Sequence, residues 1–128
     1  MPTNDPKAGY FPGRAPIEAY GNGGFRFAGM SHRGSILCLP GGVRAWGVSD
    51  AEALDVASFE DVFAEADAIG FVLLGTGRRQ VFPSRAVRQL FRDRRIGLDP
   101  MDTGAACRTY NVLLAEGRPV AAALIAVD

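Results

Sequence analysis

Six positions in this sequence combine groups that could bind a ligand or do chemistry: Thr76, Gly77, Asp102, Thr103, Cys107 and Arg108. Together they offer hydroxyls, a carboxylate, a thiol and a guanidinium, which can cap, attack or clamp a small molecule. The first pair follows the apolar run 69–74, and the others follow the run 96–101. If those runs are neighbouring parallel strands, the six residues meet in a crevice around a helix N-terminus, where an anion can bind. The sequence implies no cofactor for this crevice.

Each of these residues also has a simpler structural interpretation, and that interpretation is favoured. The run 75–77 lacks the lysine of a phosphate-binding loop and the third glycine of a dinucleotide fingerprint, so it is read as a turn. Cys107 lies beside Arg108 near a helix N-terminus, which would lower the thiol pKa, but the only histidine, His32, is distant in sequence. A small buried core residue is the favoured role for Cys107. Asp102 is favoured as a helix cap over a general base, and Arg108 as a salt-bridge partner over a carboxylate clamp.

A second set of residues could act through charge on a surface. Seven of the fourteen basic residues lie between positions 78 and 95, and four of them are placed on the outer side of a predicted helix: Arg85, Arg88, Arg92 and Arg95. The simplest interpretation of these arginines is a solvated helix face. The functional interpretation is a surface that docks on an acidic protein or peripherally on an anionic membrane. Nucleic acid is not expected, because no aromatic residues are interleaved as stacking platforms.

Three helices and several strands must position these residues. Apolar spacing predicts helices over 58–66, capped by Ser58, over 84–94 after Pro83, and over 103–116, capped by Asp102 or Thr103. A glycine-rich turn between two alternating segments predicts a hairpin. The predicted strands are 17–20, 25–27, 35–39, 43–46, 69–74, 96–101 and 120–127.

The order of these elements predicts one α/β domain over residues 16–128. Its second half reads β-α-β-α-β, which implies a partly parallel and therefore mixed sheet, while the first half supplies antiparallel strands. Residues 1–15 contain three of the eight prolines and no periodicity, so they are predicted to form a mobile or loosely packed arm. No linker separates the halves, and we expect them to share a core.

Composition excludes several classes of protein. The 128 residues are 48% hydrophobic and 22% charged with a formal net charge of zero, which suits a globular domain and argues against bulk binding of nucleic acid. No apolar run approaches the ~18 residues of a membrane span, and no basic leader precedes one, so a bacterial cytoplasmic location is expected. Cys38 and Cys107 lie in apolar stretches and are expected to be buried free thiols. Composition leaves the oligomeric state open.

Several stretches resemble one known family: Gly34 to Leu37, Trp46, Leu73 to Gly77, Met101 to Thr103, Ala105 to Asn111 and Val120 to Leu124. The family consists of small α/β domains formerly of unknown function, and includes the mitochondrial respiratory complex I assembly factor 3 and uncharacterised bacterial proteins. The resemblance implies a three-layer fold with a mixed central sheet. It also implies contacts with protein partners during biogenesis of the NADH:quinone oxidoreductase, and it carries over no catalytic residue. A non-enzymatic assembly or scaffolding protein is therefore the first hypothesis, and a small-molecule or anion-binding protein or enzyme using the crevice is the alternative.

Overall fold

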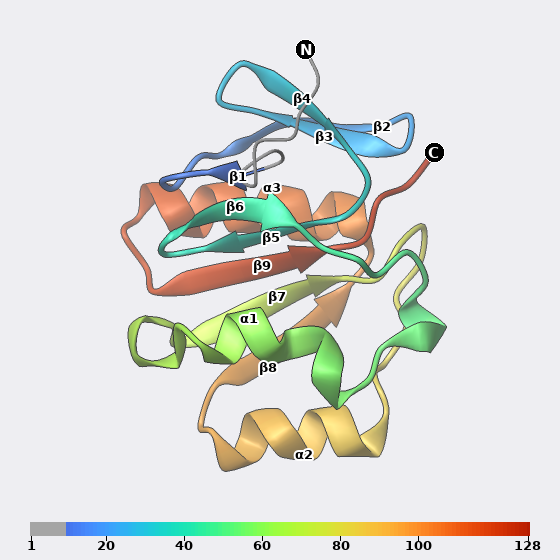
Figure 1. Cartoon of the computed structure of the whole chain (residues 1–128), viewed down its shortest axis with the longest axis vertical. Coiled ribbons are helices and arrows are strands. Elements are labelled where there is room, and N and C mark those ends of the chain that lie inside the picture. The colour runs from blue at the N-terminus through green and yellow to red at the C-terminus, as the bar shows by residue number, and fades with distance from the viewer. Residues whose placement is uncertain (1–9) are drawn as a thin grey trace.

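The computed structural model describes residues 10–128, which form two β-sheets and three α-helices (Figure 1). Short 3₁₀ turns lie at Ala51–Ala53, Val56–Phe59 and Ala66–Ala68. The helices are α1 (Glu60–Phe63), α2 (Arg85–Asp93) and α3 (Thr103–Ala115). The strands are β1 (Tyr10–Phe11), β2 (Ile17–Gly21), β3 (Gly24–Phe27), β4 (Met30–Arg33), β5 (Ile36–Leu39), β6 (Gly42–Ala45), β7 (Phe71–Gly75), β8 (Gly97–Met101) and β9 (Val120–Leu124).

The larger sheet has the strand order β1-β6-β5-β9-β7-β8 and is mixed. Strand β7 pairs in parallel with β8 on one side and with β9 on the other, whereas the β9-β5-β6-β1 pairs are antiparallel. The parallel strands are joined through α2 and α3, because a parallel pair needs a crossover connection. This confirms the predicted mixed sheet and its β-α-β-α-β half.

Apolar residues cover both faces of the central strands. In β7, Val72 and Leu74 belong to one buried cluster and Leu73 to the other, and β5 and β9 alternate in the same way. The first cluster is covered by the segment 51–68 and by α2, and the second by α3 and the three-stranded β2-β3-β4 sheet (Figure 1). Three layers result, as predicted. The small sheet and α2 lie at opposite ends of the long axis of the molecule (Figure 1).

The segment 58–66 is not the single helix that its spacing predicted. Asp55, not Ser58, caps the first turn, and the side chain of Ser58 reaches back to the Asp55 N–H at 3.0 Å. The Ser58 carbonyl accepts a hydrogen bond from the indole N–H of Trp46 at 2.8 Å. In a continuous helix this carbonyl would accept from a backbone N–H of the next turn. The segment therefore forms the short helix α1 between two 3₁₀ turns. Phe59 and Val62 are fully buried as predicted, while Phe63 is only half-buried.

Two strands were missed by the sequence reading. Strand β4 pairs antiparallel with β3, although its side chains do not alternate between apolar and polar. Strand β1 pairs with β6 at Phe11 and Val43, so the end of the predicted arm belongs to the larger sheet. Arg14 then donates a hydrogen bond to the Val120 carbonyl at 3.1 Å, and Ala15 is buried. The remainder of the predicted arm, residues 1–9, lies outside the described residues.

Candidate functional site

The loops that follow β7 and β8 lie side by side, as predicted from two parallel neighbours. Register pairs Gly75 with Met101 at the carboxyl ends of these strands. Two backbone hydrogen bonds then join the loops: the Thr76 N–H donates to the Met101 carbonyl at 2.9 Å, and the Thr103 N–H donates to the Gly77 carbonyl at 2.8 Å. The sequence-predicted residues are thus brought together, but their side chains are used in different ways.

Thr103 joins three segments of the chain. Its fully buried hydroxyl donates to the Ile125 carbonyl at 2.7 Å and accepts from the Gly77 N–H at 2.9 Å. The loop after β7, the start of α3 and the segment after β9 are therefore fixed to one side chain. Because the hydroxyl proton and an acceptor lone pair are both used, Thr103 is closed to a ligand.

Thr76 organises the loop between β7 and α2. Its Oγ1 lies 2.6 Å from the Arg79 carbonyl and 3.1 Å from the Met101 carbonyl, and it accepts from the Val81 N–H at 3.0 Å. The residue is 5% exposed. A buried hydroxyl with these backbone partners shapes its own loop, since it bonds to the Arg79 carbonyl and the Val81 N–H three and five residues further along the chain.

The N-terminus of α3 is largely occupied by groups of this chain. Asp102 is the N-cap, and its carboxylate accepts from the Ala105 N–H at 2.9 Å, which confirms the predicted cap. The Ala106 N–H donates to the Asp102 carbonyl at 3.0 Å, and the Thr103 N–H is bonded to Gly77. Of the amides 103 to 105, which have no acceptor within the helix, two are thus paired, and the cap itself is an acid, so little remains to attract an anion.

Burial holds Cys107 in its neutral form. Desolvation raises the pKa of the thiol to about 12, with a smaller lowering by Arg108 and a further raising by Asp102. The side chain packs in the core beside Tyr110, and it is 2% exposed. Cys38 is also a buried free thiol whose pKa is raised by burial. The expected role of Cys107 as a small core residue fits this environment, whereas nucleophilic chemistry would need the thiolate.

An open depression of about 420 Å³ lies where the two loops meet α3 and the small sheet. Of the predicted residues, Gly77, Asp102 and Arg108 line it, and Thr76, Thr103 and Cys107 do not. The other lining residues are Tyr20, Arg78, Gly104, Val127 and Asp128. Two guanidiniums and two carboxylates therefore share one concave surface.

Arg108 is held by a phenol in this depression and not by a carboxylate. Its Nη1 donates to the Tyr20 hydroxyl at 3.2 Å. Among the described residues no carboxylate lies within ion-pair distance of Arg108, so the predicted salt bridge is not formed. Tyr20 closes over Gly104, where an added Cβ would lie 2.5 Å from the hydroxyl oxygen. A glycine two residues after the cap leaves room for this close approach, and it is the sequence signal that could have pointed to Tyr20.

The four arginines of the second predicted set are exposed on and just beyond α2. Ser84 caps this helix and Val87 and Phe91 are buried, as predicted, while Leu90 is only half-buried. No carboxylate in residues 10–128 lies within ion-pair distance of Arg85, Arg88, Arg92 or Arg95. These charges are consequently available to a partner.

A groove accompanies this basic helix. It has a volume of about 280 Å³ and is lined by Arg88, Phe91, Arg92, Ile96 and Leu98, which come from α2, the following turn and β8. Two guanidiniums therefore flank an apolar floor. The sequence reading missed the groove because Ile96 and Leu98 belong to another element, and only the packing of α2 beside β8 brings them under the arginines.

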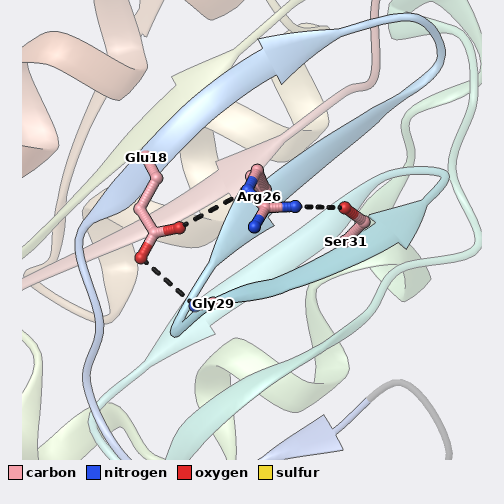
Figure 2. Close-up of polar contacts among 4 residues, drawn as sticks. All are labelled: Glu18, Arg26, Gly29 and Ser31. Carbon is pink, nitrogen blue, oxygen red and sulfur yellow. Dashed lines mark hydrogen bonds and ion pairs between the residues drawn. The ribbon is translucent and has the colours of Figure 1, made fainter.

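Four arginines elsewhere in the described chain lie within ion-pair distance of a carboxylate: Arg26, Arg44, Arg78 and Arg118. Figure 2 shows Arg26 of the small sheet between Glu18, at 3.8 Å, and the hydroxyl of Ser31, at 3.0 Å. Glu18 also accepts from the Gly29 N–H at 3.2 Å, so this arginine belongs to a small polar network. The α2 arginines differ from Arg26 in having no acidic partner.

The matching family model covers residues 17–125 and is described as a protein of unknown function, DUF498/DUF598. The chain belongs to this family. In the part of the chain that the structure describes, no helix is long and apolar enough to span a bilayer.

Relatives of this family member fall into two groups. An uncharacterized protein of Rhodobacter capsulatus is 36% identical over 94% of this chain and 91% of its own length. The NADH dehydrogenase [ubiquinone] 1 alpha subcomplex assembly factor 3 of Mus musculus is 34% identical over 90% of this chain and 62% of its own length. The chain thus spans about three fifths of that assembly factor.

A solved structure shares the fold. The crystal structure of an outer membrane protein from Bartonella henselae matches with a TM-score of 0.89 at 51% identity, and the match covers 92% of this chain and 99% of that chain. The α/β fold with a mixed sheet is therefore common to an experimentally determined relative. The family resemblance predicted from the sequence is confirmed.

Proposed function

We propose that this protein is a non-enzymatic assembly or scaffolding factor that acts in the bacterial cytoplasm and contributes to biogenesis of the respiratory NADH:quinone oxidoreductase. The assembly role is supported by homology to proteins named as assembly factors, which suggests protein partners. The complex and the location are our inference for this chain. Its docking surface is the α2 face that carries Arg85, Arg88, Arg92 and Arg95.

The observation that carries this proposal is the contrast in how polar groups are used. At the ends of β7 and β8, Thr76 and Thr103 are bonded to backbone groups and the pKa of Cys107 is raised by burial. On α2 the guanidiniums are exposed and have no acidic partner among the described residues. Exposed unpaired charge steers association with a complementary protein, while satisfied buried groups stabilise a fold.

Affinity purification from the native host tests this proposal. A tagged chain is solubilised gently and its co-purifying proteins are identified by mass spectrometry. We expect respiratory subunits or assembly proteins with the wild type, and their loss with the R85E/R88E/R92E variant. A control variant, R26E/R33E, changes arginines of the small sheet at the opposite end of the molecule and should retain the partners. Equal recovery with both variants would contradict the assignment of α2.

A second candidate function is binding of a small anion in the depression beside α3. It is favoured by the convergence of Arg78, Arg108 and the Tyr20 phenol on one concave surface. Asp102 and Asp128 line the same surface and oppose this binding. Titration of the protein with inorganic phosphate or citrate, followed by NMR, decides it: saturable amide shifts at Gly77 and Gly104 that are lost in R108Q would support binding.

A further inference from the structure

The groove between α2 and β8 combines unneutralised charge with fixed geometry. Arg88 and Arg92 are one helical turn apart and lie on the same side of the helix. The Nε of Arg88 donates to the Pro83 carbonyl at 3.2 Å, and the Nη1 of Arg92 donates to the Gln89 side chain at 3.0 Å. Neutral acceptors thus orient both guanidiniums without cancelling their charge. The remaining N–H groups can therefore form charge-assisted hydrogen bonds with the carboxylates of a partner.

The floor of the groove is apolar and small. Phe91 and Ile96 are buried and Leu98 is half-buried, so the floor is built on the hydrophobic core. A volume of about 280 Å³ lies below the roughly 300–1,000 Å³ typical of small-molecule pockets. It suits one large apolar side chain presented by another protein. Phe82, which is 68% exposed, adds apolar surface at the N-terminal end of α2.

The edge of β8 disfavours a partner that adds a strand. The Gly97 N–H and the Met101 carbonyl bond on the β7 side, so the backbone groups of Leu98 and Pro100 point away from the sheet. Pro100 has no N–H, and its carbonyl already accepts from the side chain of Gln80 at 2.9 Å. A strand added here would find few partners, which is how edges are commonly protected.

We propose that this groove binds an amphipathic helix of a partner protein, with an apolar side chain on the floor and carboxylates one turn apart against Arg88 and Arg92. This is the helix-in-groove mode of recognition, with charge setting the specificity. The proposal rests on the assembly function above and specifies the chemistry of the partner. It differs from membrane docking, because Phe82 is the only exposed large apolar residue within the segment 80–98 that carries the groove.

Two synthetic helical peptides of about 18 residues test it, a length chosen because shorter helices are marginal in water. Both carry the same leucine stripe, flanked in one by glutamates and in the other by lysines. The ¹⁵N-labelled full chain is titrated with each. We expect the glutamate peptide alone to bind, with amide shifts centred on α2, residue 96 and β8. R88E/R92E should raise the Kd of the glutamate peptide about tenfold or more, because it removes the charge-assisted contacts. R26E/R33E should leave this Kd unchanged.

Three results would overturn the proposal. The first is no binding of the glutamate peptide at millimolar concentration to a folded protein, and the second is binding that R88E/R92E leaves unchanged. The third is a different occupant: self-association in sedimentation, or co-sedimentation with phosphatidylglycerol vesicles, that R88E/R92E abolishes. A further result is recovery of respiratory partners in the affinity purification while the glutamate peptide does not bind. That result would reject the groove as the binding site and retain the assembly function.

Discussion

The carboxyl ends of β7 and β8 and the exposed face of α2 both carry polar residues, but the two regions use them differently. At the strand ends Thr76, Thr103 and Asp102 bond to backbone groups of their own chain. On α2 the basic side chains meet solvent and neutral acceptors. The first region resembles an active site in sequence and is a structural junction in three dimensions. A polar side chain is available for function only when part of its hydrogen-bonding capacity is left over, as it is for the arginines of α2.

A reactive Cys107 would remove the distinction between the two regions most completely. With a thiol pKa of about 12 against an ordinary 9.0, the thiolate fraction at pH 8 is lower by roughly a thousandfold, since each unit is tenfold. We expect alkylation by iodoacetamide to be slower by at least that factor in the native protein than in urea, as measured by mass spectrometry of the Cys107 peptide. A native rate equal to that of a free thiol would restore the nucleophile hypothesis.

The same burial has a consequence for alkaline stability. Burial raises the pKa of Cys107 above its value in the unfolded chain, and it also raises the pKa of Cys38 and Tyr110. A group whose pKa is higher in the folded than in the unfolded chain stabilises the native state while it is protonated. This contribution to the free energy of unfolding is complete below about pH 9 and is lost as the pH rises toward 12. The midpoint of urea unfolding should fall over that range. A midpoint independent of pH up to 11 would contradict the burial of these groups.

Thr103→Val tests the junction directly. Valine keeps the shape but leaves the Ile125 carbonyl and the Gly77 N–H without their partner, and each buried orphan costs about 1–3 kcal/mol, so we expect a loss of roughly 3 kcal/mol in the free energy of unfolding. Urea unfolding measures it. Thr103→Ser is the control, because it keeps the hydroxyl and should lose much less. A small loss in Thr103→Val beside a larger loss in Thr103→Ser would show that the methyl group matters and the hydrogen bonds do not.

Parts of this junction could be predicted from the sequence, and parts could not. The apolar runs before Thr76 and Asp102 predicted two strands, and parallel strands necessarily bring their carboxyl ends together. The role of Thr103 was not predictable, because its partners are backbone groups in the segment after β9 and in the loop after β7 that no local pattern identifies. The same limit applies to the segment 58–66, where Trp46, from another part of the chain, donates to the Ser58 carbonyl and Asp55 caps the first turn.

Tyr110→Phe tests a buried hydroxyl that lacks the partners of Thr103. The Tyr110 hydroxyl is buried without a hydrogen-bond partner among the described residues, unlike the threonine hydroxyls. Removing an unsatisfied buried polar group is neutral or stabilising, so we expect a change between zero and about +1 kcal/mol in the free energy of unfolding. Urea unfolding beside Thr103→Val gives the contrast, and a loss above roughly 1 kcal/mol would mean that this hydroxyl is satisfied in solution.

The smallest effect on stability is expected on α2. Arg85, Arg88 and Arg92 make no ion pair with a described carboxylate, so R85E/R88E/R92E should change the free energy of unfolding by less than about 1 kcal/mol. Thermal and urea unfolding check this. A loss comparable with that of Thr103→Val would place these arginines among the structural residues, and the distinction between the two regions would fail.

The most direct test of the account is complementation of a host strain that lacks this gene. The strain receives the wild type, R85E/R88E/R92E, or R78Q/R108Q, and the amount of assembled NADH:quinone oxidoreductase is measured on native gels at equal levels of each protein. We predict that the α2 variant fails to restore the complex, while the variant in the depression beside α3 restores it as the wild type does. Full restoration by the α2 variant, with loss in the depression variant, would contradict the account and assign function to the strand ends.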